Sequence, residues 1–336
     1  MRSKAPRRVV FFDWLGEWSM PNEGLIKILG EHGFGFVSPG SGHSPEFVIS
    51  QHHTSKNWRQ INDWRIPIDN RVLVVTEARV VDPLPFSRFL RRNYGNTFYS
   101  SHYSKTSDKL FGWPWSDGNV NSSEERIPRV VMIQANKFSA IRGEQYSLRR
   151  RVLSELLDRG IPLDLYGSGW DAKFSKNFLT ALRSDYYRIR QSIAARQFFP
   201  ASRWQYRCLN TRRFKSCGEV DNKAAILSRY RFSLVIENDR DFFTEKLMDS
   251  LASGCISFYL GPEDLVNQEL PGLILLPSTV PDLVDKVCQI LTQSDDSLPP
   301  GVEIRDAALR TFKQPPSKTW ERFGQLWLEY ILTRLP

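Results

Sequence analysis

The chain has 336 residues and a formal net charge of +9, which is enough length for two α/β domains with their own cores. No apolar run reaches the length of a membrane span, and the apolar part of the amino-terminal segment is too short for a signal sequence. The cysteines show no C-x-x-C spacing, so we expect reduced thiols and a cytoplasmic protein; they are Cys208, Cys217, Cys255 and Cys288.

The N-terminal part alternates apolar strands with amphipathic helices. The expected elements are a strand at 7–14, a helix at 23–32, and strands at 46–50 and 71–76. This alternation is typical of a parallel, doubly wound sheet. A segment rich in Gly, Asn, Ser and Glu at 116–128 is predicted to close this first domain, residues 1–128.

The same alternation restarts after the boundary, in a predicted second domain over residues 129–316. Its expected elements are a strand at 129–134, a helix at 146–159, a strand at 162–166 and a helix near 280–293. A helix within 317–336 is expected to end the chain. The sequence therefore predicts two Rossmann-like domains in an α/β protein.

The stretch 229–261 reads as a strand, a polar loop, a helix and a second strand. Thr244 is a plausible N-cap of the helix, and Gly254 lies where a left-handed residue would end it. Lys246 in the first helical turn opposes the helix dipole unless an anion is bound there. The pattern indicates a bound phosphate; the alternative is a solvated lysine.

The ordered run E-N…F-x-T-E-K-L…G-C-I-x-x-Y-x-G in this stretch resembles the signature of the family 10 glycosyltransferases, the α-1,3/1,4-fucosyltransferases. The preceding segment 218–232, with Lys223, resembles the part of that family that leads into the signature. Two features depart from the family pattern: Phe242 stands where the family has Tyr, and the loop before Thr244 is shorter.

The resemblance implies the GT-B architecture, in which two Rossmann-like domains face each other across a cleft. It also implies inverting transfer of L-fucose from GDP-fucose to a saccharide hydroxyl. No cofactor is required, with Mn²⁺ or Mg²⁺ at most stimulatory. By the same resemblance, Asn238 and Lys246 contact the diphosphate and Glu245 contacts the ribose, and the expected donor-binding set is Arg149, Arg150, Lys223, Glu237, Asn238, Phe242, Glu245 and Lys246. The family's phosphate-binding arginine matches Arg149, Arg150 or Arg151, and this choice stays open; the alternative is a solvated helix face.

Glu77 is the expected catalytic base. It follows the strand at 71–76, and ligands bind at the carboxyl ends of parallel strands. Relatives in the resembling family carry their proposed base on a glutamate in a matching stretch. The alternative for Glu77 is a surface or capping role, and Asp13 and Glu17 are then the next acids to consider.

No metal site is predicted. The D-x-D formed by Asp239, Arg240 and Asp241 matches a metal-binding motif of other glycosyltransferases, but it lies in the loop that follows Glu-Asn of the signature, so we interpret it as a coincidence. The five histidines have no ligand spacing.

Residues 183–215 form a basic, aromatic segment with nine Lys and Arg against the single Asp185. We expect it to contact the acceptor or a membrane surface; the alternative is a solvated insertion. No RRM, KH or helix-turn-helix pattern is present, so nucleic acid is not the expected partner. The functional alternatives are a transferase using another nucleotide sugar, and a noncatalytic glycan- or nucleic-acid-binding protein on a decayed transferase fold.

Overall fold

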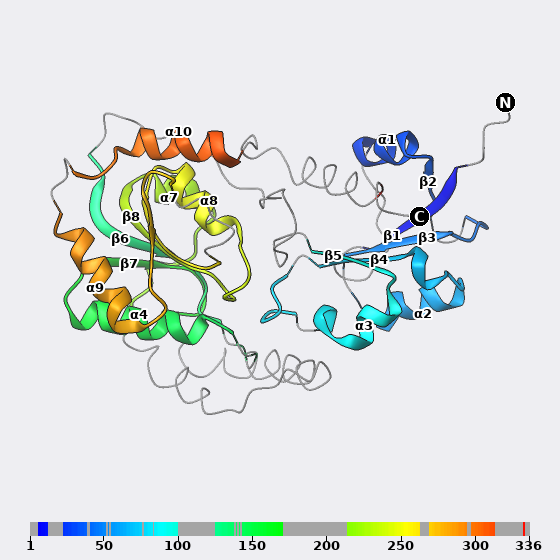
Figure 1. The fold of residues 1–336 in the computed structure, drawn as a ribbon, viewed down its shortest axis with the longest axis horizontal. Coiled ribbons are helices and arrows are strands. Elements are labelled where there is room, and N and C mark those ends of the chain that lie inside the picture. The colour runs from blue at the N-terminus through cyan, green and yellow to red at the C-terminus, as the bar shows by residue number, and fades with distance from the viewer. Residues whose placement is uncertain are drawn as a thin grey trace. The chain divides into compact units, whose positions relative to one another are not determined.

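The computed structural model describes residues 6–12, 23–38, 41–51, 53, 55–75, 77–82, 84–99, 125–137, 139, 141, 143–170, 214–262, 269–293, 297–312 and 332 (Figure 1). The chain divides into two compact units. Unit 1 comprises Met1–Ser101, Gln191–Gln197 and Lys318–Pro336, and unit 2 comprises His102–Arg190 and Phe198–Ser317. Most of the predicted boundary and of the basic, aromatic segment 183–215 lies outside the described residues, as does the predicted C-terminal helix apart from Leu332.

Unit 1 contains a parallel sheet in the order β2-β1-β3-β4-β5. Its strands are β1 (Arg7–Phe12), β2 (Phe34–Phe36), β3 (Phe47–Ser50), β4 (Arg71–Val75) and β5 (Asn96–Tyr99). Helix α1 (Glu23–Glu31) covers one face of the sheet, and α2 (Ser55–Asp63) and α3 (Arg88–Asn93) cover the other (Figure 1). The described part of the unit also contains two short 3-10 turns, η1 (Ile68–Asn70) and η2 (Leu84–Phe86). Every residue of β3 and β4 is buried, as expected for strands covered on both faces.

Unit 2 contains a second parallel sheet, in the order β10-β9-β8-β6-β7. Its strands are β6 (Ile127–Ile133), β7 (Leu163–Tyr166), β8 (Tyr230–Ile236), β9 (Ile256–Leu260) and β10 (Leu273–Leu275). Helices α4 (Tyr146–Asp158) and α9 (Val280–Leu291) lie on one face (Figure 1). Helices α7 (Lys223–Leu227), α8 (Glu245–Ala252) and α10 (Gly301–Phe312) lie on the other.

Helix α8 shows how local sequence builds this unit. Thr244 is its N-cap, and Leu247 and Leu251 are fully buried one turn apart. The helix ends at Gly254, which has φ of +74° and a would-be Cβ only 2.6 Å from the Gly301 carbonyl oxygen. A left-handed backbone with no room for a side chain requires glycine here.

Arg126, in the segment leading into β6, completes the carboxyl end of α8. Its guanidinium donates to the carbonyl oxygens of Ser253 and Gly254, both at 2.6 Å, and of Tyr230 at 3.0 Å. Carbonyls at a helix terminus have no partner within the helix. Arg126 therefore stabilises the end of α8 and the start of β8 together.

The predicted strands and helices that fall on described residues are confirmed, with bounds that shift by one or two residues. The elements that the sequence analysis missed are β2, β5, α2, α3, α7, β10 and α10.

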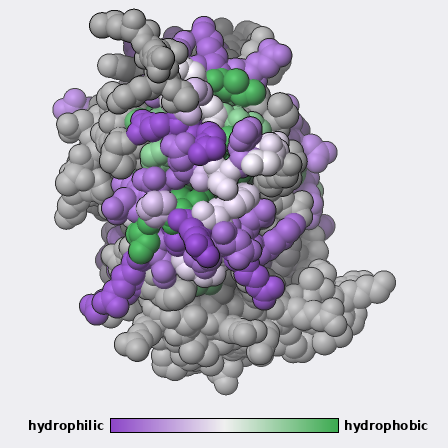
Figure 2. Space-filling view, turned by 90° about the vertical axis from the view of Figure 1, so that its right-hand side faces the viewer, coloured by the Kyte–Doolittle hydropathy of each residue, from purple (hydrophilic) through white to green (hydrophobic). Residues whose placement is uncertain are grey.

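On the side of the molecule shown in Figure 2, the described surface is mainly polar. Figure 2, which looks onto the side of the molecule at the right of Figure 1, shows hydrophilic residues with small, separate hydrophobic patches. Large exposed apolar side chains in the described part of the chain are Ile26, Ile68 and Leu157. Among the same described residues, no helix is both long enough and apolar enough to cross a membrane.

Candidate functional site

The sheet of unit 2 has a topological switch point between β6 and β8. From β6 the chain passes through α4 to β7 on one side, and it later returns to β8 on the other side. In open α/β sheets ligands bind outside the carboxyl ends of the strands at such a point. The residues that follow β6 and β8, beginning at Gln134 and Glu237, therefore form the edge of the candidate site.

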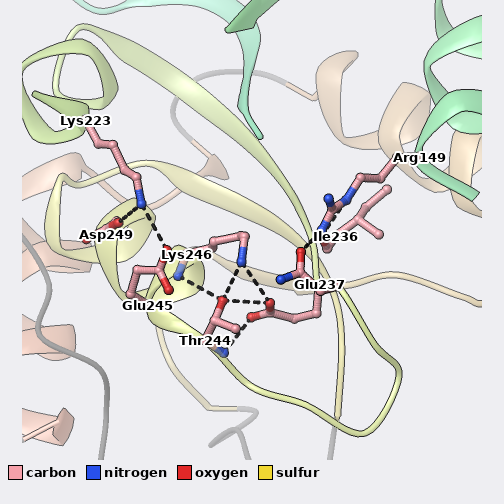
Figure 3. Close-up of polar contacts among 9 residues, drawn as sticks. Arg149, Lys223, Ile236, Glu237, Thr244, Glu245, Lys246 and Asp249 are labelled. Atoms are coloured by element: carbon pink, nitrogen blue, oxygen red, sulfur yellow. Dashed lines mark hydrogen bonds and ion pairs between the residues drawn. The ribbon is translucent and has the colours of Figure 1, made fainter. Parts of the chain in front are cut away.

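Glu237 ties the end of β8 to the start of α8 (Figure 3). Its carboxylate accepts hydrogen bonds from the Thr244 backbone N at 3.0 Å and from the Thr244 hydroxyl at 2.7 Å. The side chain is fully buried. In this conformation Glu237 positions the helix start and offers no exposed surface to a ligand, so its predicted contact with the donor stays a prediction.

Lys246 turns back toward this same carboxylate. Its ammonium donates to Thr244 Oγ1 at 2.8 Å and lies 3.5 Å from Glu237 Oε2, with 16% of its side chain exposed. The negative charge that offsets a cation in the first helical turn is therefore supplied by the protein itself. The sequence analysis assigned that charge to a bound phosphate, and the phosphate contact stays a prediction.

A second cluster joins the starts of α7 and α8. Lys223 Nζ bonds Glu245 Oε1 at 3.0 Å and Asp249 Oδ2 at 3.2 Å. Burial opposes ionisation of Glu245, but the charges of Lys246 and Lys223 outweigh it and lower the pKa of Glu245 to about 2. Glu245 thus stays ionised and keeps 28% of its side chain exposed.

Asp249 is a member of this cluster that the sequence analysis missed. It lies four residues after Glu245, and residues at this spacing share one face of a helix. That spacing was a usable signal, because two acids on one helix face repel each other and a nearby cation offsets the repulsion.

Arg149 reaches the end of β8 from the opposite face of the sheet (Figure 3). Its Nε donates to the Ile236 carbonyl oxygen at 3.0 Å, and its Nη2 donates to Asn238 Oδ1 at 2.9 Å. Arg149 is 2% exposed, and this burial lowers the pKa of its guanidinium from the ordinary value. Asn238 is only partly buried, so it lies at the rim of the site.

Arg150 and Arg151 point elsewhere. Arg150 is 1% exposed and donates to Asn136 Oδ1 at 3.1 Å and to the Lys137 carbonyl oxygen at 2.9 Å, both just after β6. Arg151 is exposed. Of the three adjacent arginines, the structure brings Arg149 and Arg150 to the switch point and leaves Arg151 on the helix surface.

The aromatic and glycine positions of the signature are explained by packing. Phe242 is 1% exposed and lies in the interior of unit 2. A side chain at Gly261 would overlap the Tyr259 hydroxyl and lie 2.8 Å from Glu237 Cγ. Tyr259 and Gly261 therefore fit together around the buried carboxylate.

The two acids of the D-x-D lie in different environments, with Asp239 fully buried and Asp241 exposed. Within the described ranges of the chain, no group of three or more His, Cys, Asp and Glu could hold a metal ion.

Glu77 lies just after β4, at the carboxyl edge of the sheet of unit 1, and is partly buried. Its position on a parallel sheet is the one expected. Its role as a base, and that it faces the nucleotide site, stay predictions.

Comparison with known proteins identifies the fold. No family model matches the sequence, and no curated protein matches it. Anabaena HepE in complex with UDP and glucose superposes with a TM-score of 0.51 at 13% identity, over 97% of this chain and 98% of that chain. HepE in complex with UDP-glucose superposes with a TM-score of 0.50 at 12% identity, over 97% of this chain and 98% of that chain. An α1,3-fucosyltransferase superposes with a TM-score of 0.48 at 13% identity, over 99% of this chain and 92% of that chain. The chain has the GT-B fold of glycosyltransferases, with two parallel-sheet Rossmann-like halves, as predicted.

Proposed function

We propose that this protein is a glycosyltransferase that uses a nucleotide-sugar donor, and that the donor is GDP-fucose, as in family 10. The observation that carries the proposal is the group of charged and polar residues at the carboxyl ends of β6 and β8, where open α/β sheets bind ligands. The signature residues Asn238, Glu245 and Lys246 all lie in this group.

In the proposed reaction the acceptor hydroxyl attacks the anomeric carbon of the donor in a single displacement. Glu77 takes the hydroxyl proton, the bond from the anomeric carbon to the phosphate oxygen breaks, and GDP leaves with the electron pair. Lys246 and the N-terminal N–H groups of α8 stabilise the charge that develops on the leaving group. The configuration at the anomeric carbon is inverted. We further propose that residues 183–215 contact the acceptor or the membrane that carries it.

A second donor, a UDP-sugar, is the alternative. Two observations favour it: the fold is similar to HepE, which was crystallised with UDP-glucose, and Phe242 lacks the hydroxyl found at this position in family 10. The two candidates share the fold and differ in the nucleotide.

Thermal unfolding in the presence of nucleotides separates them. We expect GDP to raise Tm and UDP to leave it unchanged; at a GDP concentration one hundred times Kd, the stabilisation should be about 2.7 kcal/mol. A larger shift with UDP would favour the second donor. A protein that is stabilised by no nucleoside diphosphate and no nucleotide sugar would contradict the transferase assignment and favour a binding protein on a decayed fold.

A further inference from the structure

Tyr259 lies on the same face of the sheet of unit 2 as Glu237. The ladder pairs Tyr259 of β9 with Val235 of β8 and continues to Glu237, two residues later, and side chains two residues apart share a face. Ser257, two residues before Tyr259, bonds to Ser250 of α8 at 2.6 Å, which identifies this face as the one that α8 covers. Tyr259 and the carboxylate of Glu237 therefore both lie between the sheet and the α8 side of the unit.

The hydroxyl of Tyr259 is buried next to the Glu237 side chain. Tyr259 is 1% exposed, and its hydroxyl has no hydrogen-bond partner in the described part of the chain. The point at which a Cβ on Gly261 would lie is 2.1 Å from this hydroxyl oxygen and 2.8 Å from Glu237 Cγ. Burial and the negative charge of Glu237 raise the pKa of Tyr259 well above its ordinary value, so the hydroxyl keeps its proton. A donor thus lies beside the carboxylate without being bonded to it.

A nucleotide phosphate would change the surroundings of Glu237. Its carboxylate accepts two hydrogen bonds from Thr244 and lies 3.5 Å from the ammonium of Lys246 (Figure 3). When Lys246 turns to a phosphate, as the proposed function requires, the buried carboxylate loses the ammonium that pairs with it. Such a loss is costly unless another donor compensates for it. An ionised carboxylate accepts about four hydrogen bonds, so Glu237 has capacity for a further donor while it keeps Thr244.

We propose that Tyr259 is a positioning residue that donates its O–H to Glu237 when Lys246 binds the phosphate of the donor. The ammonium then exchanges one anion for another, and Glu237 still holds the start of α8 through Thr244. The inference rests on the proposed function for the identity of the anion. The exchange itself depends on three side chains of this protein, so removal of the ammonium should produce it without a ligand.

A double-mutant cycle of Lys246→Met and Tyr259→Phe tests the exchange in the ligand-free protein. In the wild-type background Tyr259→Phe removes a hydroxyl that makes no hydrogen bond to the described residues, so Tm should stay unchanged or rise. In the Lys246→Met background the same change removes the donor that stabilises the Glu237 carboxylate, and Tm should fall by about 3–6 °C. The expected result is a coupling between the two positions, whereas the effects of independent sites add.

Tyr230→Phe is the matched control. Tyr230 is also buried, but it lies at the first residue of β8, at the opposite end of the strand from Glu237, and its hydroxyl donates to Asp164 at 2.9 Å. We expect Tyr230→Phe to lower Tm by the same amount with and without Lys246→Met. Lys246→Gln replaces Lys246→Met if the methionine variant does not fold.

Calorimetric titration with GDP, or with UDP if UDP is the nucleotide bound, tests the link to the donor. Tyr259→Phe should weaken nucleotide binding about tenfold, because only the bound state loses a hydrogen bond. Equal changes in Tm on Tyr259→Phe in both backgrounds, as for a hydroxyl bonded to water, would overturn the inference. Unchanged nucleotide affinity in Tyr259→Phe would also overturn it and would leave the proposed function intact. Coupling in a protein that binds no nucleotide would support the exchange and overturn the proposed function.

Discussion

The ammonium nitrogen of Lys246 lies 3.5 Å from Oε2 of Glu237, a carboxylate that is fully buried at the end of β8. A phosphate that binds Lys246 must therefore compete with a charge that the protein already places there. The affinity for an anion at the start of α8 therefore depends on two things: the competition between the anion and Glu237 for Lys246, and the attraction of the helix N-terminus.

Replacing Lys246 by methionine should weaken GDP binding about tenfold or more, because a charge-assisted contact to phosphate is lost. The same change leaves Glu237 buried without its cation, so Tm should fall as well. Titration calorimetry below the new Tm measures the first effect and thermal unfolding the second. Lys27→Met, at an exposed lysine of α1, is the matched control and should change neither. Undiminished GDP affinity in Lys246→Met would exclude a phosphate contact.

The cluster of Lys223, Glu245 and Asp249 predicts an acid-sensitive contribution to stability. The pKa of Glu245 is lowered from 4.5 to about 2, so its stabilising effect is complete above pH 4.5 and is lost as pH falls toward 2. Lys223→Met removes one of the two cations that lower this pKa. The Tm difference between wild type and variant, followed from pH 7 to pH 2, should therefore shrink below pH 4.5. A difference that is constant over this range would contradict the charge argument.

Gly254 and Gly160 provide a matched pair for the end of a helix. Both have positive φ, +74° and +70°, but a side chain at Gly254 would lie 2.6 Å from the Gly301 carbonyl oxygen, whereas Gly160 has nothing within 4 Å. Substitution by alanine should cost about 1 kcal/mol at Gly160 from backbone strain alone, and more at Gly254. The loss of unfolding free energy in each variant is measured by urea unfolding. Equal losses for the two alanine variants would show that α10 moves away from α8 without cost.

Glu77→Gln should lower kcat by about 10²–10⁴ and leave GDP affinity unchanged, since glutamine keeps the size of the side chain and cannot accept the proton. Single-turnover transfer assays and calorimetry measure the two quantities separately. Near-normal turnover of Glu77→Gln would show that another acid of the N-terminal half is the catalytic base. Asp13 and Glu17 are the next acids to replace.

Chelation should leave transfer activity largely intact, because the proposed site offsets phosphate charge with Lys246 and a helix N-terminus. Activity with and without EDTA, followed by addition of Mn²⁺, measures this. Complete loss with EDTA and recovery with Mn²⁺ would instead assign a metal to the acids at 239 and 241.

Helices and strands that depend on short-range signals were predictable from the sequence. The unit from β8 to β9 has an apolar run, an N-cap at Thr244 and a terminating glycine at 254, and each of these signals acts within a few residues. Short or polar elements were missed: β2 has three residues, and the polar sequence of α2, SKNWRQIND, obscures its apolar face.

For the candidate site, the sequence analysis located the strand ends and the start of α8, but it missed Asp249 and did not predict which side chains bond to each other. The strand ends follow from the position of the switch point. The pairing of Lys246 with Glu237, however, depends on how the loop between β8 and α8 folds back. The buried side-chain amide of Gln134, which has no hydrogen-bond partner among the described residues, belongs to no sequence motif. Such relationships depend on tertiary packing, which periodicity does not encode.

Arg149 and Arg150 are consecutive in α4, so their side chains leave the helix about 100° apart. One bonds to the end of β8 and the other to the residues after β6. A single helical turn thus acts as a spacer that holds the two strand ends at a fixed separation. These bonds lie beyond the last pairing of β6 with β8, at Val131 and Ser233, so α4 anchors the two strand ends where the ladder no longer joins them.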